Sequence, residues 1–120
     1  MTNQQIANRL VELCSQGKNF DAMEELYADD IVSVEATARG GITDFKNKVP
    51  VIQKSRDWAA AHEIHNLAIQ GPYLCGDKFA VTFDIDVTNK ASGQRAAFRE
   101  VAVYFTRDGK IYREEFYYGS

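Results

Sequence analysis

The chain has 120 residues, of which 45% are hydrophobic and 26% are charged, a balance typical of a folded globular protein. This length suits one hydrophobic core, so we expect a single domain over residues 1–120. The formal net charge of -3 argues against nucleic acid or an anionic membrane as the main partner. No apolar run is long enough for a transmembrane helix. The first residues lack the basic start and apolar centre of a signal peptide, so we expect a cytoplasmic location.

The N-terminal part of the chain shows two helical patterns followed by a strand. Apolar residues at helical spacing predict one helix over residues 2–16 and a second over residues 20–29. The apolar run that follows predicts a strand over residues 31–36, which carries Glu35 near its end. An acid at such a position costs desolvation energy unless it is used or paired. Glu35 is therefore the first candidate functional residue.

The middle of the chain combines a loop with an interrupted helix. Two adjacent glycines predict a loop over residues 38–41. The spacing of apolar residues predicts helical structure over residues 43–62. Pro50 lies inside this stretch and cannot donate to a helix interior, so it should either kink the segment or start a second helix.

From residue 63 onward the apolar pattern changes from helical to alternating, which is typical of strands. Glycine-containing turns separate these strands, and tight turns imply antiparallel neighbours. The predicted strands cover residues 64–69, 79–88, 97–106 and 110–118. The order of elements predicts an α+β fold, with the helices on one face of one mainly antiparallel sheet.

Five different short motifs follow one another along nearly the whole chain. They are Leu26-Tyr-Ala-Asp-Asp30, Gln70-Gly-Pro72, Gly76-Asp-Lys-Phe-Ala-Val81, Arg107-Asp-Gly-Lys-Ile111 and Glu114-Glu-Phe-Tyr117. This order resembles the nuclear transport factor two-like superfamily, and within it the SnoaL-like, ketosteroid-isomerase-like branch. The resemblance implies a cone-shaped fold, in which a curved sheet wraps around N-terminal helices and encloses a pocket. Members of the superfamily include isomerases, dehydratases, polyketide cyclases and non-enzymatic binding proteins, so function has to be argued from the site.

The resemblance also implies which side chains face the pocket. Glu35 stands at the same offset from the Tyr-Ala-Asp-Asp motif as the general-base aspartate of the ketosteroid isomerases. Counting back from Gly-Pro places His65 on a pocket-facing position, and Tyr118 could supply a phenol donor. We take Glu35, His65 and Tyr118 as the candidate catalytic residues. Strand alternation and the resemblance together give the expected pocket lining, which is Trp58, Phe98, Glu100, Ala102, Tyr104, Glu114 and Phe116.

Two positions depart from the ketosteroid isomerase pattern. Val11 and Ala102 stand where those enzymes have their oxyanion donors, and neither side chain can donate a hydrogen bond. Steroid isomerisation by that route is therefore not expected. The resemblance still suggests proton transfer of the isomerase, cyclase or dehydratase type on a small, largely apolar, oxygenated molecule, with Glu35 as general base. The alternative is a non-catalytic small-molecule-binding or accessory protein.

The roles of Glu35 and His65 stay open at this point. Glu35 is either a base, whose pKa an apolar pocket would raise, or a carboxylate paired with Arg39 or His65. His65 is either an acid–base partner of a glutamate or a hydrogen-bonded core histidine.

The sequence implies no cofactor and one kind of protein partner. The two cysteines, Cys14 and Cys75, show no metal-ligand spacing, and the chain has no phosphate loop or dinucleotide fingerprint. We therefore expect neither a metal site nor an organic cofactor. Val101, Val103 and Phe105 alternate onto the outer face of the predicted sheet, where apolar residues need a cover. A homodimer through this outer face would provide it.

Overall fold

The computed structural model describes residues 1–39 and 42–118 of the chain. The described residues form three helices, which are α1 (Asn3–Ser15), α2 (Asn19–Leu26) and α3 (Lys48–Ala61). They also form six strands, which are β1 (Tyr27–Arg39), β2 (Ile42–Lys46), β3 (His62–Cys75), β4 (Lys78–Asn89), β5 (Arg95–Arg107) and β6 (Lys110–Tyr117). In chain order, α1, α2, β1 and β2 precede α3, and the other four strands follow it.

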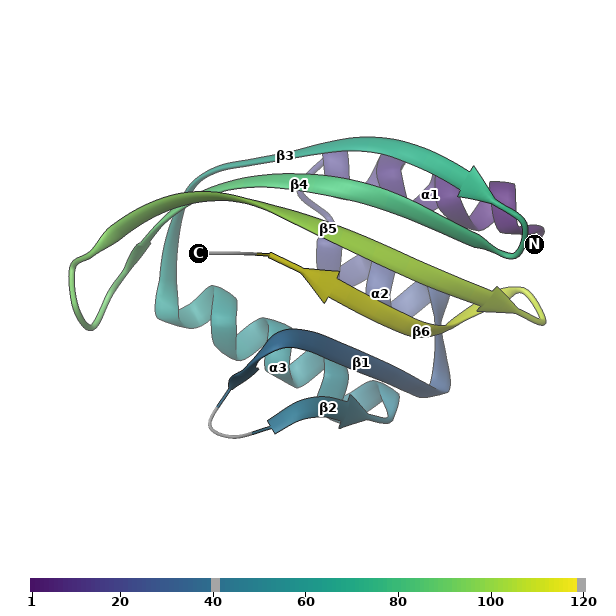
Figure 1. The fold of residues 1–120 in the computed structure, drawn as a ribbon, viewed down its shortest axis with the longest axis horizontal. Helices are drawn as coiled ribbons and strands as arrows, with labels where there is room; N and C mark the ends of the chain where they lie inside the picture. The colour runs from purple at the N-terminus through teal and green to yellow at the C-terminus, as the bar shows by residue number, and fades with distance from the viewer. Residues whose placement is uncertain (40–41, 119–120) are drawn as a thin grey trace.

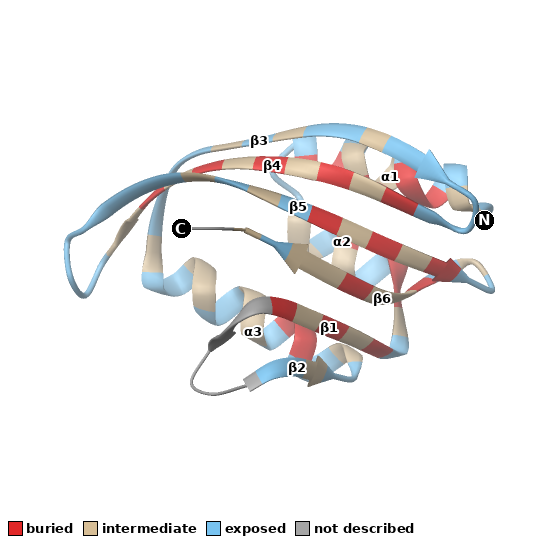
Figure 2. Ribbon diagram, viewed as in Figure 1, coloured by how far each residue is buried: buried red, intermediate tan, exposed pale blue. Residues whose placement is uncertain are grey.

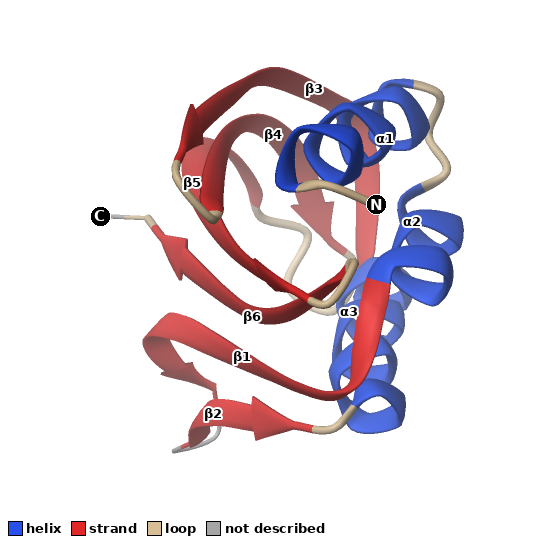
Figure 3. Cartoon of the chain, turned by 90° about the vertical axis from the view of Figure 1, so that its right-hand side faces the viewer, coloured by secondary structure: helices blue, strands red, loops and turns tan. Residues whose placement is uncertain are grey.

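The strands of the described chain form one sheet in the order β2-β1-β6-β5-β4-β3. Neighbouring strands are antiparallel, except that β1 and β6 run parallel. The sheet is strongly curved, and the helices lie on its concave side (Figure 1, Figure 3). The predicted α+β fold, a curved and mainly antiparallel sheet around the N-terminal helices, is confirmed.

The core lies between helix α1 and the concave face of the sheet. Ile6, Leu10 and Leu13 form the buried face of α1, at the helical spacing that the sequence predicted. Burial alternates along β4, from Phe79 to Val87, because successive side chains point to opposite faces of the sheet (Figure 2). No helix in residues 1–39 or 42–118 combines the length and the apolar character that a membrane span needs.

The second helix is shorter than predicted. It ends at Leu26 instead of residue 29, because Tyr27 already has extended backbone torsions, with φ -79 and ψ 135. The Tyr-Ala-Asp-Asp motif therefore begins strand β1 and does not end helix α2. Of the loop predicted over residues 38–41, the first two residues belong to β1, and residues 40–41 lie outside the described residues.

The segment predicted as one interrupted helix divides into a strand and a helix. Residues 42–46 form strand β2, which pairs with β1. The chain then turns at Asn47, which has φ 75, and α3 begins at Lys48. Pro50 lies in the first turn of α3, where a backbone N–H would have no partner within the helix. Pro50 therefore marks the start of a helix, which is one of the two outcomes that the sequence allowed.

Candidate functional site

The concave face of β5 and β6 carries six of the seven side chains that were predicted to line a pocket; the seventh, Trp58, lies on α3. Ala102 lies opposite Phe116, and Tyr104 lies opposite Glu114, so these residues share one face of the two strands. Ala102, Tyr104 and Glu114 are buried within the core. Other residues of the same face are half-buried; they are Phe98, Glu100 and Phe116.

Strand β1 delivers Glu35 to this face, next to helix α3. Its side chain is buried, with 7% of the residue exposed. Its Oε1 lies 2.8 Å from Nζ of Lys54, and its Oε2 accepts a hydrogen bond from the hydroxyl of Tyr118 at 3.1 Å. Glu35 is thus an ion-paired carboxylate. Lys54 was not among the predicted partners, and the side chain of Arg39, which was, lies outside the described residues.

Lys54 projects from the middle of α3 into a largely apolar setting. Its Nζ also donates to Oγ of Ser33 at 2.7 Å. The same nitrogen lies 5.1 Å from the ring centroid of Phe45 and 5.2 Å from that of Phe116. Aromatic faces attract a cation, and the carboxylate of Glu35 offsets the cost of removing the ammonium from water.

A signal for Lys54 is present in the sequence. Val51, Lys54 and Trp58 follow one another at the spacing of one helix face, so a charged residue stands within an apolar stripe. Val51 is buried and Trp58 is half-buried in the structure. A lysine at such a position needs a buried partner, which here is Glu35.

Glu114 lies deeper on the same face and is fully buried. Its Oε2 accepts a hydrogen bond from the hydroxyl of Tyr27, while its Oε1 has no hydrogen-bond partner among the described residues. Burial raises the pKa of Glu114 and outweighs Lys54 and the hydroxyls of Tyr27 and Ser33, which lower it, while Glu35 raises it further. The surroundings therefore shift Glu114 toward its protonated form, beside the ion pair of Glu35 and Lys54.

These polar groups follow one another from the core to the end of strand β6. We call this set the buried polar chain; it consists of Tyr27, Glu114, Ser33, Lys54, Glu35 and Tyr118. Ser33 connects its two halves, because it lies opposite Glu114 in the β1–β6 pair and accepts a hydrogen bond from Lys54. The chain offers a carboxylate that can take a proton, and an ammonium and a phenol that can stabilise negative charge.

His65 does not lie with these side chains. It is exposed, and its Nε2 is 2.7 Å from Oγ1 of Thr88, which is on the outer face of the sheet. The register between β3 and β4 shifts between Ile64 and Asn66, so the alternation of side chains reverses at this point. The pocket-facing position predicted for His65 is therefore wrong.

A pocket of about 220 Å³ opens between the C-terminal end of α3 and the β4–β5 turn. We call it the α3-end pocket; residues that line it include Trp58, His62, Val87, Asn89, Gln94 and Phe98. The ring centroid of Phe98 is 6.3 Å from that of Tyr118, which in turn binds Glu35. The pocket therefore adjoins the outer end of the buried polar chain. Two of the predicted lining residues, Trp58 and Phe98, lie in it.

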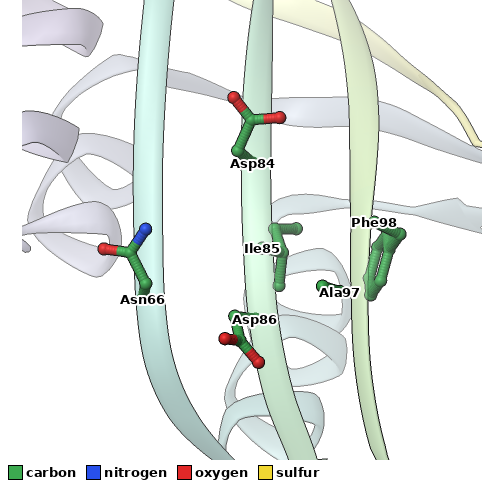
Figure 4. Close-up of a pocket in the computed structure, with 6 residues that line it drawn as sticks. All are labelled: Asn66, Asp84, Ile85, Asp86, Ala97 and Phe98. Atoms are coloured by element: carbon green, nitrogen blue, oxygen red, sulfur yellow. The ribbon is translucent and has the colours of Figure 1, made fainter.

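A second hollow, of about 370 Å³, lies over strands β3, β4 and β5 (Figure 4). Its lining consists of Asn66, Asp84, Ile85, Asp86, Ala97 and Phe98. Asp84 is bound to Arg99 and Asp86 to Arg95, and all four side chains are substantially exposed. Exposed pairs of this kind contribute little energy, so we interpret them as a polar ladder on the outer face. In the described part of the chain, no three His, Cys, Asp or Glu side chains gather so that they could hold a metal ion.

The raised pKa of Glu114 predicts how stability changes with pH. In the unfolded chain its carboxyl ionises near the ordinary pKa of 4.5, whereas in the folded protein it keeps its proton to higher pH. Above pH 4.5 the folded state therefore binds more protons, so this group makes the free energy of unfolding fall as pH rises toward the folded pKa. Glu114→Gln removes this titration and should lose less stability than the wild type as pH rises.

Urea unfolding of the two proteins at a series of pH values measures this difference. Glu25→Gln is a suitable control, because Glu25 is an exposed, ion-paired carboxylate on α2, and its pKa is lowered by a hydrogen bond from Arg9. Well above pH 4.5, where Glu25 is ionised in both the folded and the unfolded chain, this control should keep the wild-type slope. Parallel curves for the wild type and Glu114→Gln would contradict the raised pKa of Glu114.

Comparisons with known proteins identify the family. A family model described as a SnoaL-like domain matches residues 1–118. The chain is 44% identical to a proposed SnoaL-like polyketide cyclase from Mesorhizobium loti; 98% of this chain and 100% of that one are covered, with a TM-score of 0.93. The curated proteins give no match.

Two further solved structures share the fold at low identity. A proposed isomerase from Bacillus subtilis is 17% identical, with a TM-score of 0.77 over 99% of this chain and 90% of that one. A nuclear transport factor two-like protein from Burkholderia thailandensis is also 17% identical, with a TM-score of 0.83 over 99% and 92% of the two chains. The chain therefore belongs to the SnoaL-like family and has the cone-shaped α+β fold that its motifs implied.

Proposed function

We propose that this SnoaL-like protein moves a proton on a small, largely apolar, oxygenated molecule, with Glu35 as the general base. The observation that supports the proposal is the carboxylate of Glu35, held by Lys54 and Tyr118 beside the α3-end pocket. A buried ion pair usually stabilises a fold no better than apolar side chains of similar volume would. Its position next to a pocket therefore favours a chemical role.

In the proposed reaction, the molecule enters through the α3-end pocket and presents an acidic C–H group to Glu35. The carboxylate takes the proton, and the electron pair of the C–H bond moves onto an adjacent carbonyl oxygen to form an enolate. Return of the proton to another carbon completes an isomerisation. Attack of the enolate carbon on a second carbonyl closes a ring, and the resulting alkoxide takes the proton back from Glu35. In a dehydration, the enolate expels hydroxide from the next carbon, and the hydroxide leaves as water with the proton from Glu35.

Lys54 and Tyr118 would supply the stabilisation that an enolate requires. When Glu35 accepts a proton it loses its negative charge, so the ammonium and the phenol are no longer bound to an anion. Both donors can then interact with the substrate oxygen to which the charge has moved. In this account they replace the oxyanion donors that are missing at Val11 and Ala102.

The Mesorhizobium loti relative supports this class of reaction. It is 44% identical over nearly the whole of both chains and is described as a proposed polyketide cyclase. Ring closure between two carbonyl-bearing carbons proceeds through an enolate, so such an activity would need the base and the donors that Glu35, Lys54 and Tyr118 provide.

A second function, ligand binding without turnover, is favoured by the ion pair itself. Both oxygens of Glu35 already have partners, Lys54 and Tyr118. A carboxylate that takes a proton gives up most of its attraction to a bound cation, and this opposes the proton transfer. If that cost dominates, the α3-end pocket serves a binding or accessory protein.

The base role can be tested with 5-nitrobenzisoxazole, a small planar probe that needs no cofactor. A base removes the proton from its ring carbon, the N–O bond breaks, and a coloured cyanophenolate forms, whose absorbance gives the rate. The wild type should accelerate this reaction. Glu35→Gln should lower the rate about 100-fold, because an amide cannot accept the proton.

Glu25→Gln serves again as the control, since Glu25 is an ion-paired glutamate far from the pocket on the exposed surface of α2. It should keep the wild-type rate. Equal rates for folded wild type and folded Glu35→Gln would exclude Glu35 as the base. Binding of the probe without any rate above that of buffer would favour the non-catalytic function.

We also propose that two chains associate through the outer face of the sheet. Val101 and Tyr117 are cross-strand neighbours on this face and are 36% and 51% exposed. Val103 and Phe105 continue the apolar surface along β5. Adjacent apolar side chains on an open sheet face are typical of an interface, and a symmetric dimer covers the same face on both chains.

Sedimentation equilibrium tests this association. The wild type should sediment with twice the 13.5 kDa mass of one chain. Tyr117→Asp should sediment as a monomer, because it places a charge in the interface, whereas Asn8→Asp on the exposed side of α1 should remain a dimer. A monomeric wild type at micromolar concentration would contradict the proposed dimer.

A further inference from the structure

The α3-end pocket has the size of one substituted ring. Its volume is about 220 Å³, and a buried apolar cavity of about 150 Å³ in another protein is large enough to bind benzene. Trp58, Phe98 and Val87 give the pocket apolar walls, while Asn89 and Gln94 are polar residues at the β4–β5 turn. Flat aromatic walls of this kind favour a planar ligand.

His62 belongs to one of these walls and is held in one orientation. Its ring stacks on Trp58, with centroids 4.4 Å apart and an angle of 20° between the planes. Its Nδ1 lies 2.8 Å from the backbone carbonyl oxygen of Trp58. A carbonyl oxygen can only accept, so Nδ1 must carry the hydrogen. In the neutral ring, Nε2 is then a hydrogen-bond acceptor.

Helix α3 and the contact between Phe98 and Tyr118 connect the α3-end pocket with the buried polar chain. Lys54 and Trp58 are four residues apart on α3, so they lie along one face of the helix, and His62, the first residue of β3, stacks on Trp58. On the opposite side, Phe98 contacts Tyr118, which donates to Glu35. A molecule whose ring lies against Trp58 can therefore extend toward Tyr118 and Glu35.

We propose that the α3-end pocket binds a planar ring that bears a hydroxyl group, with Nε2 of His62 accepting the hydroxyl hydrogen. The ring packs between the stacked pair of Trp58 and His62 and the side chain of Phe98. This assigns the substrate class as phenol-like and makes His62 the residue that selects it. The assignment rests on the proposed function in one respect: the part of the ligand outside the ring has to reach Glu35.

Phenol and anisole are suitable probes, because anisole has the same ring and oxygen but no hydroxyl hydrogen. Their affinities can be measured by NMR titration of the ¹⁵N-labelled protein. Phenol should bind the wild type about tenfold more tightly than anisole does, which corresponds to one neutral hydrogen bond. His62→Phe keeps an aromatic wall and removes the acceptor, so phenol should bind this variant about as weakly as anisole. His65→Phe, on the outer face, should change neither affinity.

The proposal would be overturned by equal affinity of the wild type for phenol and anisole, or by phenol-induced shifts confined to residues outside the pocket. If His62→Phe does not fold, the wild type itself decides the matter. Long-range ¹H–¹⁵N spectra of the neutral His62 ring should place the proton on Nδ1, and a proton on Nε2 would refute the acceptor role.

Failure of this proposal can be distinguished from failure of the proposed function. Selective phenol binding without turnover of 5-nitrobenzisoxazole would reject the base role and retain the phenol site. Turnover that depends on Glu35, without any preference for phenol over anisole, would reject the phenol site alone.

Discussion

The ion pair between Glu35 and Lys54 is the interaction on which the rest of the candidate site depends. The side chains of Lys54 and Glu35 are only 10% and 5% exposed, and either charge alone would be costly to bury. Glu35 comes from β1 and Lys54 from α3, two elements joined through β2. Because each charge needs the other, α3 cannot slide along β1 without leaving one of them unpaired. The pair therefore couples the position of the helix to the chemistry of the site.

The same pair connects the interior of the protein with its surface. On the inner side, Lys54 binds Ser33, which lies opposite Glu114, the buried acid whose pKa is raised. On the outer side, Glu35 binds Tyr118, whose ring contacts Phe98 at the α3-end pocket. Lys54 thus pairs with Glu35, while burial favours the protonated form of Glu114. A proton that arrives from the pocket at Glu35 would change the charge balance of the whole chain of groups.

The fold could be predicted from the sequence, because it follows from local periodicity and from the motifs that resemble the family, and so could the face of the sheet that carries several candidate residues. Strand alternation places Phe98, Glu100 and Phe116 on one face, and the motif spacing brings Glu35 to the same face. The partner Lys54 was missed, since a lysine on a helix normally faces water. His65 was misplaced, because the register shift in β3 depends on its pairing with β4 and leaves no local pattern. Strand β2 was missed for a similar reason, as its pairing with β1 stabilises it more than its own composition does.

The central claim, that Glu35 and Lys54 form one buried interacting unit, is tested most directly by a double-mutant cycle on stability. The free energy of unfolding would be measured for the wild type, Glu35→Gln, Lys54→Met and the double variant. Lys54→Met alone leaves a buried carboxylate without its cation and should be strongly destabilising, whereas the double variant should recover much of the loss. The account predicts a coupling energy of about 2–3 kcal/mol. A coupling energy within about 0.5 kcal/mol of zero, with additive effects of the two substitutions, would contradict it.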